Sequence, residues 1–192
     1  MAIFLILAPY GAFAFLMPVT SAAVSLFAAA AICLAVIAFD VVRGRSVKIL
    51  GAGSVIVFTA VGVYLTLIDP ALSNFAVKLA VDAGIFLVSL TSIVVRRPFT
   101  RQYALEMVDA ETARLPGFIK ANYIIAWVWT GAALLMMIGN IAVMYVPGFP
   151  LWSGLLVAFA ARNSAVYFTK WYPKYRKAKY GAAPANALPG SH

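Results

Sequence analysis

Cysteine and histidine are almost missing from this chain of 192 residues, which has one cysteine, Cys33, and one histidine, His192. A single cysteine excludes a disulfide within the chain. Structural zinc needs four ligands, usually cysteine and histidine, and haem held within the membrane by paired histidines needs two of them. We therefore expect no metal site and no cofactor.

Charged residues are also scarce. Only 11% of the residues are charged and 64% are hydrophobic, whereas a soluble domain is about one-quarter charged and about one-half apolar. A soluble chain of this size could not bury so much apolar surface, so the expected solvent is the lipid bilayer. The net charge is +9, but the basic residues form short clusters between apolar runs, as in cytoplasmic loops. We therefore expect no nucleic-acid partner.

Long apolar runs predict an all-α, polytopic transmembrane helical bundle, because a membrane-spanning helix needs about 20 apolar residues. The expected spans are residues 2–17, 21–42, 49–68, 72–95, 120–146 and 151–171. The first run is short and contains Pro9 and Gly11, so six spans become five if it does not cross. Residues 173–192 are expected to form a cytoplasmic tail that is basic at first and disordered after Tyr180.

Basic residues gather in alternate connections, which predicts the orientation. The basic connections are residues 43–48, 96–120 and 170–179, and the others are residues 17–20, 69–71 and 147–150. The second set carries one charge, Asp69. Since basic loops stay in the cytoplasm, we expect a multi-pass protein of a bacterial inner membrane with both termini cytoplasmic. Its basic loops would attract anionic lipid head groups by about 1 kcal/mol per Lys or Arg.

Two charged residues fall near the middle of predicted spans. Asp82 lies ten residues into its span and Arg162 eleven residues into its own, so both are about 15 Å deep in a hydrocarbon core about 30 Å thick. An unpaired charge there costs about 2.5–3.5 kcal/mol on insertion scales. We therefore expect the fourth and sixth spans to pack together with Asp82 facing Arg162, and Asn163 and Ser164 to add hydrogen bonds.

Two further polar residues share a shallower depth. Lys78 and Asn140 both lie about 9 Å from the outer ends of their spans and are expected to meet, although Asp82, one helical turn from Lys78, is a rival partner. Intramembrane charges often mark an ion or proton path. A buried pair that orients two helices is favoured here, because the interior has one carboxylate and no histidine.

Small residues at four-residue spacing mark one face of the second span. They are Ser21, Ser25, Ala29 and Cys33. Such a row lets two helix backbones approach closely. Packing within the chain is favoured over a face for a second copy or another subunit.

The connector after the fourth span is polar, and it starts with two arginines that end the apolar run. Its candidate contact residues are Arg96, Arg97, Pro98, Thr100, Arg101, Gln102 and Tyr103. We expect an interfacial segment over residues 98–116, in which Thr100 caps a short helix that runs to about Val108. Salt bridges with Arg101 and Arg114 are expected for Glu106 and Asp109.

The sequence contains no recognisable arrangement of catalytic residues. The Ser153-Gly154 pair has no histidine to activate the serine. The aspartates at 40, 69, 82 and 109 are not spaced to hold magnesium, and Gly51-Ala52-Gly53 is typical of helix packing rather than of a phosphate loop. We expect no catalytic residues and no enzymatic activity.

The order of these features is similar to that of the bacterial intracellular septation protein A family of small polytopic inner-membrane proteins. The resemblance is distant and runs from about residue 35 to residue 152. It rests on Lys78, Arg97-Pro98, Arg101-Gln102, Lys120-Ala121-Asn122, Ala126-Trp127, Gly139-Asn140-Ile141-Ala142 and Tyr145. It implies a role in envelope maintenance and cell division through protein contacts. The resemblance implies no catalytic residue. It implies only a structural role for Lys78, Pro98, Asn122, Trp127 and Asn140.

Three functions stay open at this point. The first is a non-enzymatic protein that contacts other membrane proteins or a second copy of itself. The second is a small transporter or channel that uses Lys78, Asp82, Asn140 and Arg162. The third is an accessory subunit of a larger membrane complex.

Overall fold

The computed structural model describes residues 2–180, in which every regular element is helical. The elements are α1 (Ala2–Leu16), α2 (Ala22–Val42), α3 (Ile49–Leu67), α4 (Asn74–Val94), α5 (Phe99–Ala104), η1 (Leu105–Met107), η2 (Thr112–Arg114), α6 (Pro116–Tyr145) and α7 (Leu151–Tyr180). Four of them, α2, α3, α4 and α6, are long and apolar enough to cross a membrane. The predicted all-α class is confirmed for the described residues, and the length and composition of these four helices are those of a multi-pass membrane protein. The count of six spans is not confirmed.

The two remaining long helices differ from the four for separate reasons. Helix α1 has 15 residues and is about 22 Å long, which is shorter than the hydrocarbon core of about 30 Å. Helix α7 has 30 residues, but Arg162 and Asn163 interrupt its apolar half and its last third is basic. Helix α1 is therefore too short, and helix α7 is too polar, to be counted among the helices that are long and apolar enough to cross a membrane.

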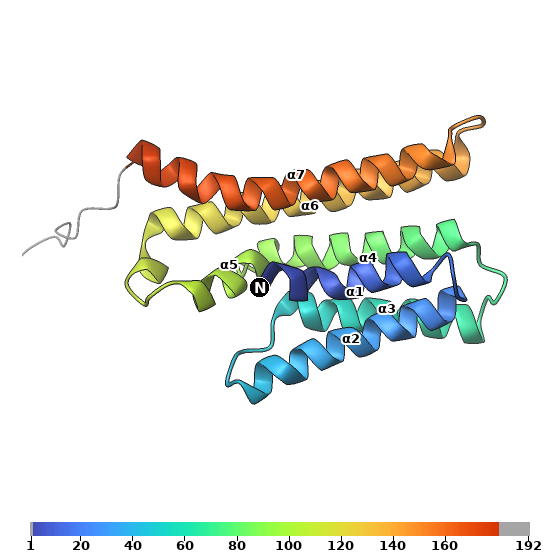
Figure 1. The fold of residues 1–192 in the computed structure, drawn as a ribbon, viewed down its shortest axis with the longest axis horizontal. Coiled ribbons are helices and arrows are strands. Elements are labelled where there is room, and N and C mark those ends of the chain that lie inside the picture. Colours follow the sequence, from blue (N-terminus) through green and yellow to red (C-terminus); the bar gives the residue numbers. More distant parts are fainter. Residues whose placement is uncertain (1, 181–192) are drawn as a thin grey trace, which may run out of the picture.

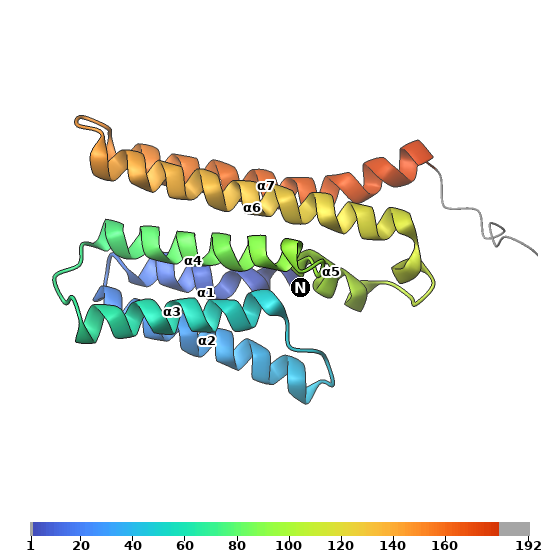
Figure 2. The same cartoon turned by 180° about the vertical axis from the view of Figure 1, so that it is seen from behind.

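The helices form two groups that share one bundle. Helices α6 and α7 pack along each other and form one layer, as Figure 1 shows. Helix α4 packs on α6, α3 packs on α4, α2 on α3, and α1 on α2. Seen from behind in Figure 2, α4 lies between α6 and α3. The α2–α3 loop, the connector after α4 and the end of α7 lie at one end of the bundle, and the three tight turns lie at the other.

One cluster of buried apolar residues is formed by α1, α2, α3 and the first half of α4. Phe58 of α3 is fully buried and packs against Phe13 of α1, with ring centroids 5.6 Å apart. The hydroxyl groups of Tyr10 and Ser54 are hydrogen-bonded across the same two helices. On α2 the small-residue face is buried within the chain: Ser25 and Ala29 are inaccessible, and Cys33 is 3% exposed. The prediction that this face packs inside the chain is confirmed for Ser25, Ala29 and Cys33, whereas Ser21 is exposed at the start of α2.

Two helix boundaries differ from the predicted ones. Helix α6 begins at Pro116 rather than at residue 120, because proline suits the first position of a helix. Helix α7 runs nine residues past its predicted end and through Pro173. Ring stacking of Phe168 on Tyr172 and of Trp171 on Tyr175 supports this extension. The expected tail is therefore helical up to residue 180, and its predicted disorder lies outside the described residues.

Helix α4 ends in a turn formed by Arg96 and Arg97, the first two residues of the connector. Arg96 adopts a left-handed conformation with φ 59°, the position where glycine is usual after a helix. The Arg97 N–H donates to the carbonyl of Ser92 at 2.9 Å, and the Ser92 hydroxyl accepts from the Phe99 N–H at 3.2 Å. The chain is thus turned sharply from α4 into α5.

Helices α3 and α4 approach through two reciprocal glycine contacts. A Cβ added at Gly84 would lie 2.6 Å from the side chain of Val57, and one added at Gly53 would lie 2.5 Å from that of Val88. Each glycine therefore receives a valine of the facing helix. Gly131 of α6, in contrast, has nothing within 4 Å of its added Cβ.

We expect Gly84→Ala to destabilise the protein and Gly131→Ala to leave it unchanged or more stable. Overpacking costs about 1–3 kcal/mol, whereas alanine in open helix space gains up to about 1 kcal/mol over glycine. Thermal unfolding of both variants in the same detergent measures the difference. A Gly84→Ala protein as stable as the wild type would contradict this packing.

Candidate functional site

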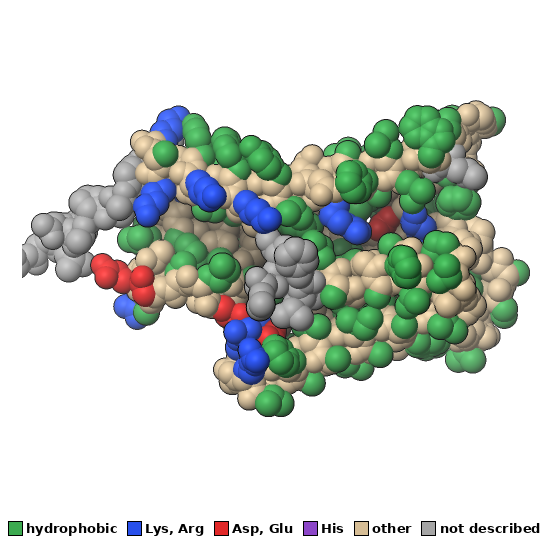
Figure 3. Space-filling model, in the orientation of Figure 1, with side chains coloured by type: hydrophobic (Ala, Val, Ile, Leu, Met, Phe, Trp, Pro, Cys, Tyr) green, Lys and Arg blue, Asp and Glu red, His purple; other side chains and the backbone are tan. Residues whose placement is uncertain are grey.

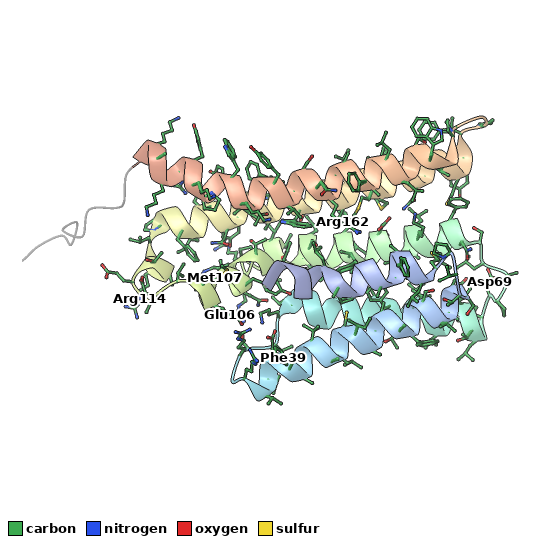
Figure 4. All side chains as sticks on the ribbon, in the orientation of Figure 1. Phe39, Asp69, Glu106, Met107, Arg114 and Arg162 are labelled. Carbon is green, nitrogen blue, oxygen red and sulfur yellow. The ribbon has the colours of Figure 1, made fainter. Side chains whose placement is uncertain are left out.

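Polar side chains from three helices meet within the bundle. Asp82 of α4 accepts a hydrogen bond from the side-chain amide of Asn140 on α6, with 2.5 Å between Nδ2 and Oδ2. Asn140 is 5% exposed. The positive charges of Lys78 on α4 and Arg162 on α7 both act on the Asp82 carboxylate. Figure 4 shows Arg162 between α7 and α4. We call these four residues the membrane polar cluster.

The structure assembles this cluster differently from the prediction. Helices α4 and α7 both pack on α6, so α6, not α7, supplies the direct partner of Asp82. Among the described residues, the ion pairs within 4 Å do not include Asp82 or Arg162. The predicted Asp82–Arg162 pair is therefore a longer-range attraction, and the Asn140 amide serves Asp82 rather than Lys78.

Asn163 lies outside the cluster. It is exposed on α7, where its side-chain amide donates to the carbonyl of Phe159 at 2.8 Å. Ser164 is also exposed. The prediction that these two residues add hydrogen bonds to the interior is wrong, because they follow Arg162 around the helix and leave its inward face.

An apolar groove runs from Arg162 toward the connector end of the bundle. Its volume is about 130 Å³. Its lining includes Tyr10 of α1, Ile85 of α4, Tyr103 of α5, Trp129 and Ala133 of α6, and Thr169 of α7. The indole N–H of Trp129 donates to the Thr169 hydroxyl at 2.9 Å and joins two of these walls. Figure 3 shows the surface hollowed between the α6–α7 layer and the other helices. We call this feature the lateral groove.

A second cluster of charges lies at the connector end. The Lys48 ammonium lies 2.5 Å from a carboxylate oxygen of Asp40 and 2.9 Å from one of Glu106. Arg45 approaches the same two carboxylates at 3.4 and 3.7 Å. These four residues come from the end of α2, the α2–α3 loop and η1, and Figure 4 places Glu106 on the connector beside that loop. We call them the charge clamp.

Burial makes Lys48 the centre of the charge clamp. Its side chain is 5% exposed, against 40% for Arg45. Burial by itself would lower the pKa of Lys48, but the carboxylates of Asp40 and Glu106 outweigh it and raise that pKa. The ammonium also lies 5.3 Å from the ring centre of Tyr103. Burial raises the pKa of Tyr103, so its hydroxyl stays neutral.

Sequence reasoning missed the charge clamp. It expected Glu106 to pair within the connector and residues 43–48 to form a basic cytoplasmic loop that attracts anionic lipid. The structure instead pairs Glu106 with Arg45 and Lys48 across more than fifty residues of sequence. The available signal was Asp40, an acidic residue at the end of an apolar span, next to a loop with three basic residues.

Further hydrogen bonds fix the connector to the bundle. The side-chain oxygen of Gln102 accepts from the Ile49 N–H at 2.7 Å, which satisfies a free N–H group at the start of α3. The Thr100 hydroxyl donates to the carbonyl of Asn122 on α6 at 2.7 Å. The predicted cap by Thr100 is wrong, because Pro98 precedes α5 and no side chain caps it.

The other candidate connector residues divide by exposure. Pro98 is fully buried, and Arg96 and Arg97 are exposed. Within the described residues, the buried Nε atom of Arg101 has no hydrogen-bond partner. Asp109 accepts hydrogen bonds from the backbone and side chain of Thr112, which lower its pKa. Asp109 thus forms a local turn rather than the expected salt bridge.

In the described part of the chain, no three His, Cys, Asp or Glu side chains lie close enough together to hold a metal ion. Comparison of the chain with family models, with curated proteins and with solved structures gives no match.

We expect Lys48→Met to destabilise the protein far more than Arg45→Met. Removing Lys48 leaves two partly buried carboxylates without their close cation, and breaking a buried pair costs on the order of 3 kcal/mol. Arg45 is exposed, and such pairs contribute about 0–1 kcal/mol. Thermal unfolding at pH 8 compares the two variants.

The pH dependence provides the control for this comparison. Because the Lys48 pKa is raised on folding, its contribution to stability is complete below the unfolded value of about 10.4. It is lost as the pH rises through the higher folded value. The stability gap between wild type and Lys48→Met should therefore persist at pH 10 and shrink above it. A gap that is already gone at pH 9 would contradict the charge clamp.

Proposed function

We propose that this multi-pass membrane protein is non-enzymatic and acts by contacting other membrane proteins through its connector. The observation that supports this most is that the connector is held in place at three separate points. The charge clamp binds it to the α2–α3 loop, Gln102 binds it to α3, and Thr100 binds it to α6. A segment ordered in this way presents a fixed surface, which lowers the entropic cost of binding a partner.

The exposed side of the connector has the composition of a contact surface. Met107 is 77% exposed and Leu105 is 40% exposed. Exposed apolar residues on a polar segment outside the spans favour an interaction site. The carboxylates of Asp109 and Glu111 border them. This surface is the proposed site of contact, and a second copy of the chain is one candidate partner.

The proposed topology has six spans, in which α1 and α7 cross together with the four apolar helices. It is supported by the arrangement of the connections, since the basic ones lie at one end of the bundle and the tight turns at the other. Basic loops favour the cytoplasm, so both termini would be cytoplasmic in a bacterial inner membrane. The resemblance to the septation protein A family suggests envelope maintenance or cell division as the process.

A second candidate function is transport, because four polar residues gather inside the membrane bundle. Asp82 is bonded to Asn140 and lies within the field of two cations. A proton path that uses Asp82 would require water to reach this carboxylate from one end. The lateral groove leads from Arg162 to the connector, but its lining is largely apolar. The contact function is therefore the better supported of the two.

Photo-crosslinking in intact membranes tests the contact function. A photoreactive residue at Met107 should crosslink to a discrete protein, because this position lies on the proposed surface. A photoreactive residue at Leu155, which is 63% exposed on a predicted span, should label lipid. The Met107 crosslink should weaken in a Lys48→Met background, which releases the connector. Labelling of lipid alone from Met107 would overturn the proposal.

Proton flux into vesicles tests the transport alternative. If Asp82 carries protons, vesicles with the wild-type protein should acidify faster than empty ones, and Asp82→Asn should abolish the difference. Asp109→Asn is the matched control, because Asp109 is an exposed aspartate on the connector. Equal rates for wild-type and empty vesicles would exclude a proton path.

A further inference from the structure

The membrane polar cluster holds more positive than negative charge. Lys78 and Arg162 supply two cations, and Asp82 is the one carboxylate among the four residues. That carboxylate already accepts a short hydrogen bond from Asn140. Among the described residues, neither cation forms an ion pair within 4 Å. Because uncompensated charge within a bilayer is costly, the cluster favours an additional anion.

The lateral groove begins where this excess charge lies. Arg162 lines its end, and the groove then follows α7 as far as Thr169. Seven residues of helix correspond to about 10 Å. Its volume of about 130 Å³ is close to the roughly 150 Å³ of an apolar cavity that accepts benzene. A helix about 10 Å across would not fit such a space, whereas a single hydrocarbon chain would.

The position of Lys78 relates the cluster to one bilayer leaflet. Lys78 lies four residues after Asn74, the first residue of α4, and is therefore about 6 Å from the helix end. Long basic side chains extend toward the head-group level while their stems stay in apolar surroundings. Lys78 can therefore meet a phosphate from the leaflet at the α3–α4 end, and the long side chain of Arg162, whose backbone lies about 16 Å from the same end of α7, extends toward that phosphate from below.

We propose that the lateral groove binds one anionic phospholipid from that leaflet, with its phosphate at Lys78 and Arg162 and one acyl chain beside Trp129. The charge excess supplies the attraction for the head group, and the apolar walls exclude water around the chain. This site is separate from the basic loops at the connector end. It is independent of the proposed contact function.

Quenching of Trp129 by brominated lipid tests the proposal. A variant keeps Trp129 and replaces the other three tryptophans with phenylalanine: Trp127, Trp152 and Trp171. It is placed in phosphatidylcholine vesicles with a matched fraction of brominated phosphatidylglycerol or brominated phosphatidylcholine. The anionic lipid should be preferred at Trp129 by roughly fivefold or more, as two cations near a phosphate imply. A variant that keeps only the lipid-facing Trp127, which is 54% exposed, should show little preference.

Charge and volume variants decide where the lipid binds. Lys78→Gln with Arg162→Gln should remove the preference for the anionic lipid, whereas Lys170→Gln with Lys174→Gln, at the other end of α7, should retain it. Ala133→Leu keeps the charges and fills the groove, so it should reduce quenching by the anionic lipid even if the first pair of changes impairs folding. Equal quenching by the two lipids, or a preference lost only in the Lys170/Lys174 variant, would overturn the proposal.

Discussion

The absence of water in a bilayer is the constraint on which this structure depends. Each backbone N–H and C=O group in the hydrocarbon must be paired within its own segment, so the chain crosses as helices and confines irregular backbone to the ends. The turns at Asp69-Pro70 and Pro147-Gly148 obey this rule, and so does the connector that follows Arg96. The same constraint explains why polar side chains inside the bundle bond to each other or to a backbone carbonyl, as Asn140 does to Asp82 and Ser54 to Leu50.

The two charged clusters resolve this constraint in different ways. In the charge clamp two cations meet two carboxylates, and Asp40 and Glu106 raise the pKa of Lys48 although its burial acts in the opposite direction. This balance makes the clamp a structural element that holds the connector. In the membrane polar cluster the charges do not balance, and an apolar groove opens beside them. This imbalance beside an apolar groove is the basis of the proposed lipid site.

Helix α6 connects these two regions. It carries Asn140 in the membrane polar cluster, Trp129 in the lateral groove, and the Asn122 carbonyl that accepts from Thr100 of the connector. It also packs against both α4 and α7. A change in the packing of α6 on α4 would therefore alter both the lateral groove and the anchoring of the connector.

Sequence patterns predicted the helices well and their partners poorly. Apolar run length located α2, α3 and α4 to within about two residues, because a span must match the thickness of the bilayer. The end of α7 was missed, because ring stacking and packing on α6 carry that helix through Pro173. The depth argument placed Asp82 and Arg162 about 15 Å deep and Asn140 at the shallower level of Lys78, whereas the structure bonds Asn140 to Asp82. Depth does not define the rotation of a helix, so it chose the wrong direct partner for Asp82.

The amino-acid sequence by itself determined the solvent, the helical class and the ends of the bundle where basic residues gather, because these follow from hydropathy and charge along one dimension. Only the tertiary structure decided that Glu106 belongs to Lys48, that Asn163 faces outward, and that an apolar groove begins at Arg162. Those facts depend on which faces of the helices meet across long stretches of chain. That choice is made by close packing, such as Gly84 against Val57, and not by the composition of either helix.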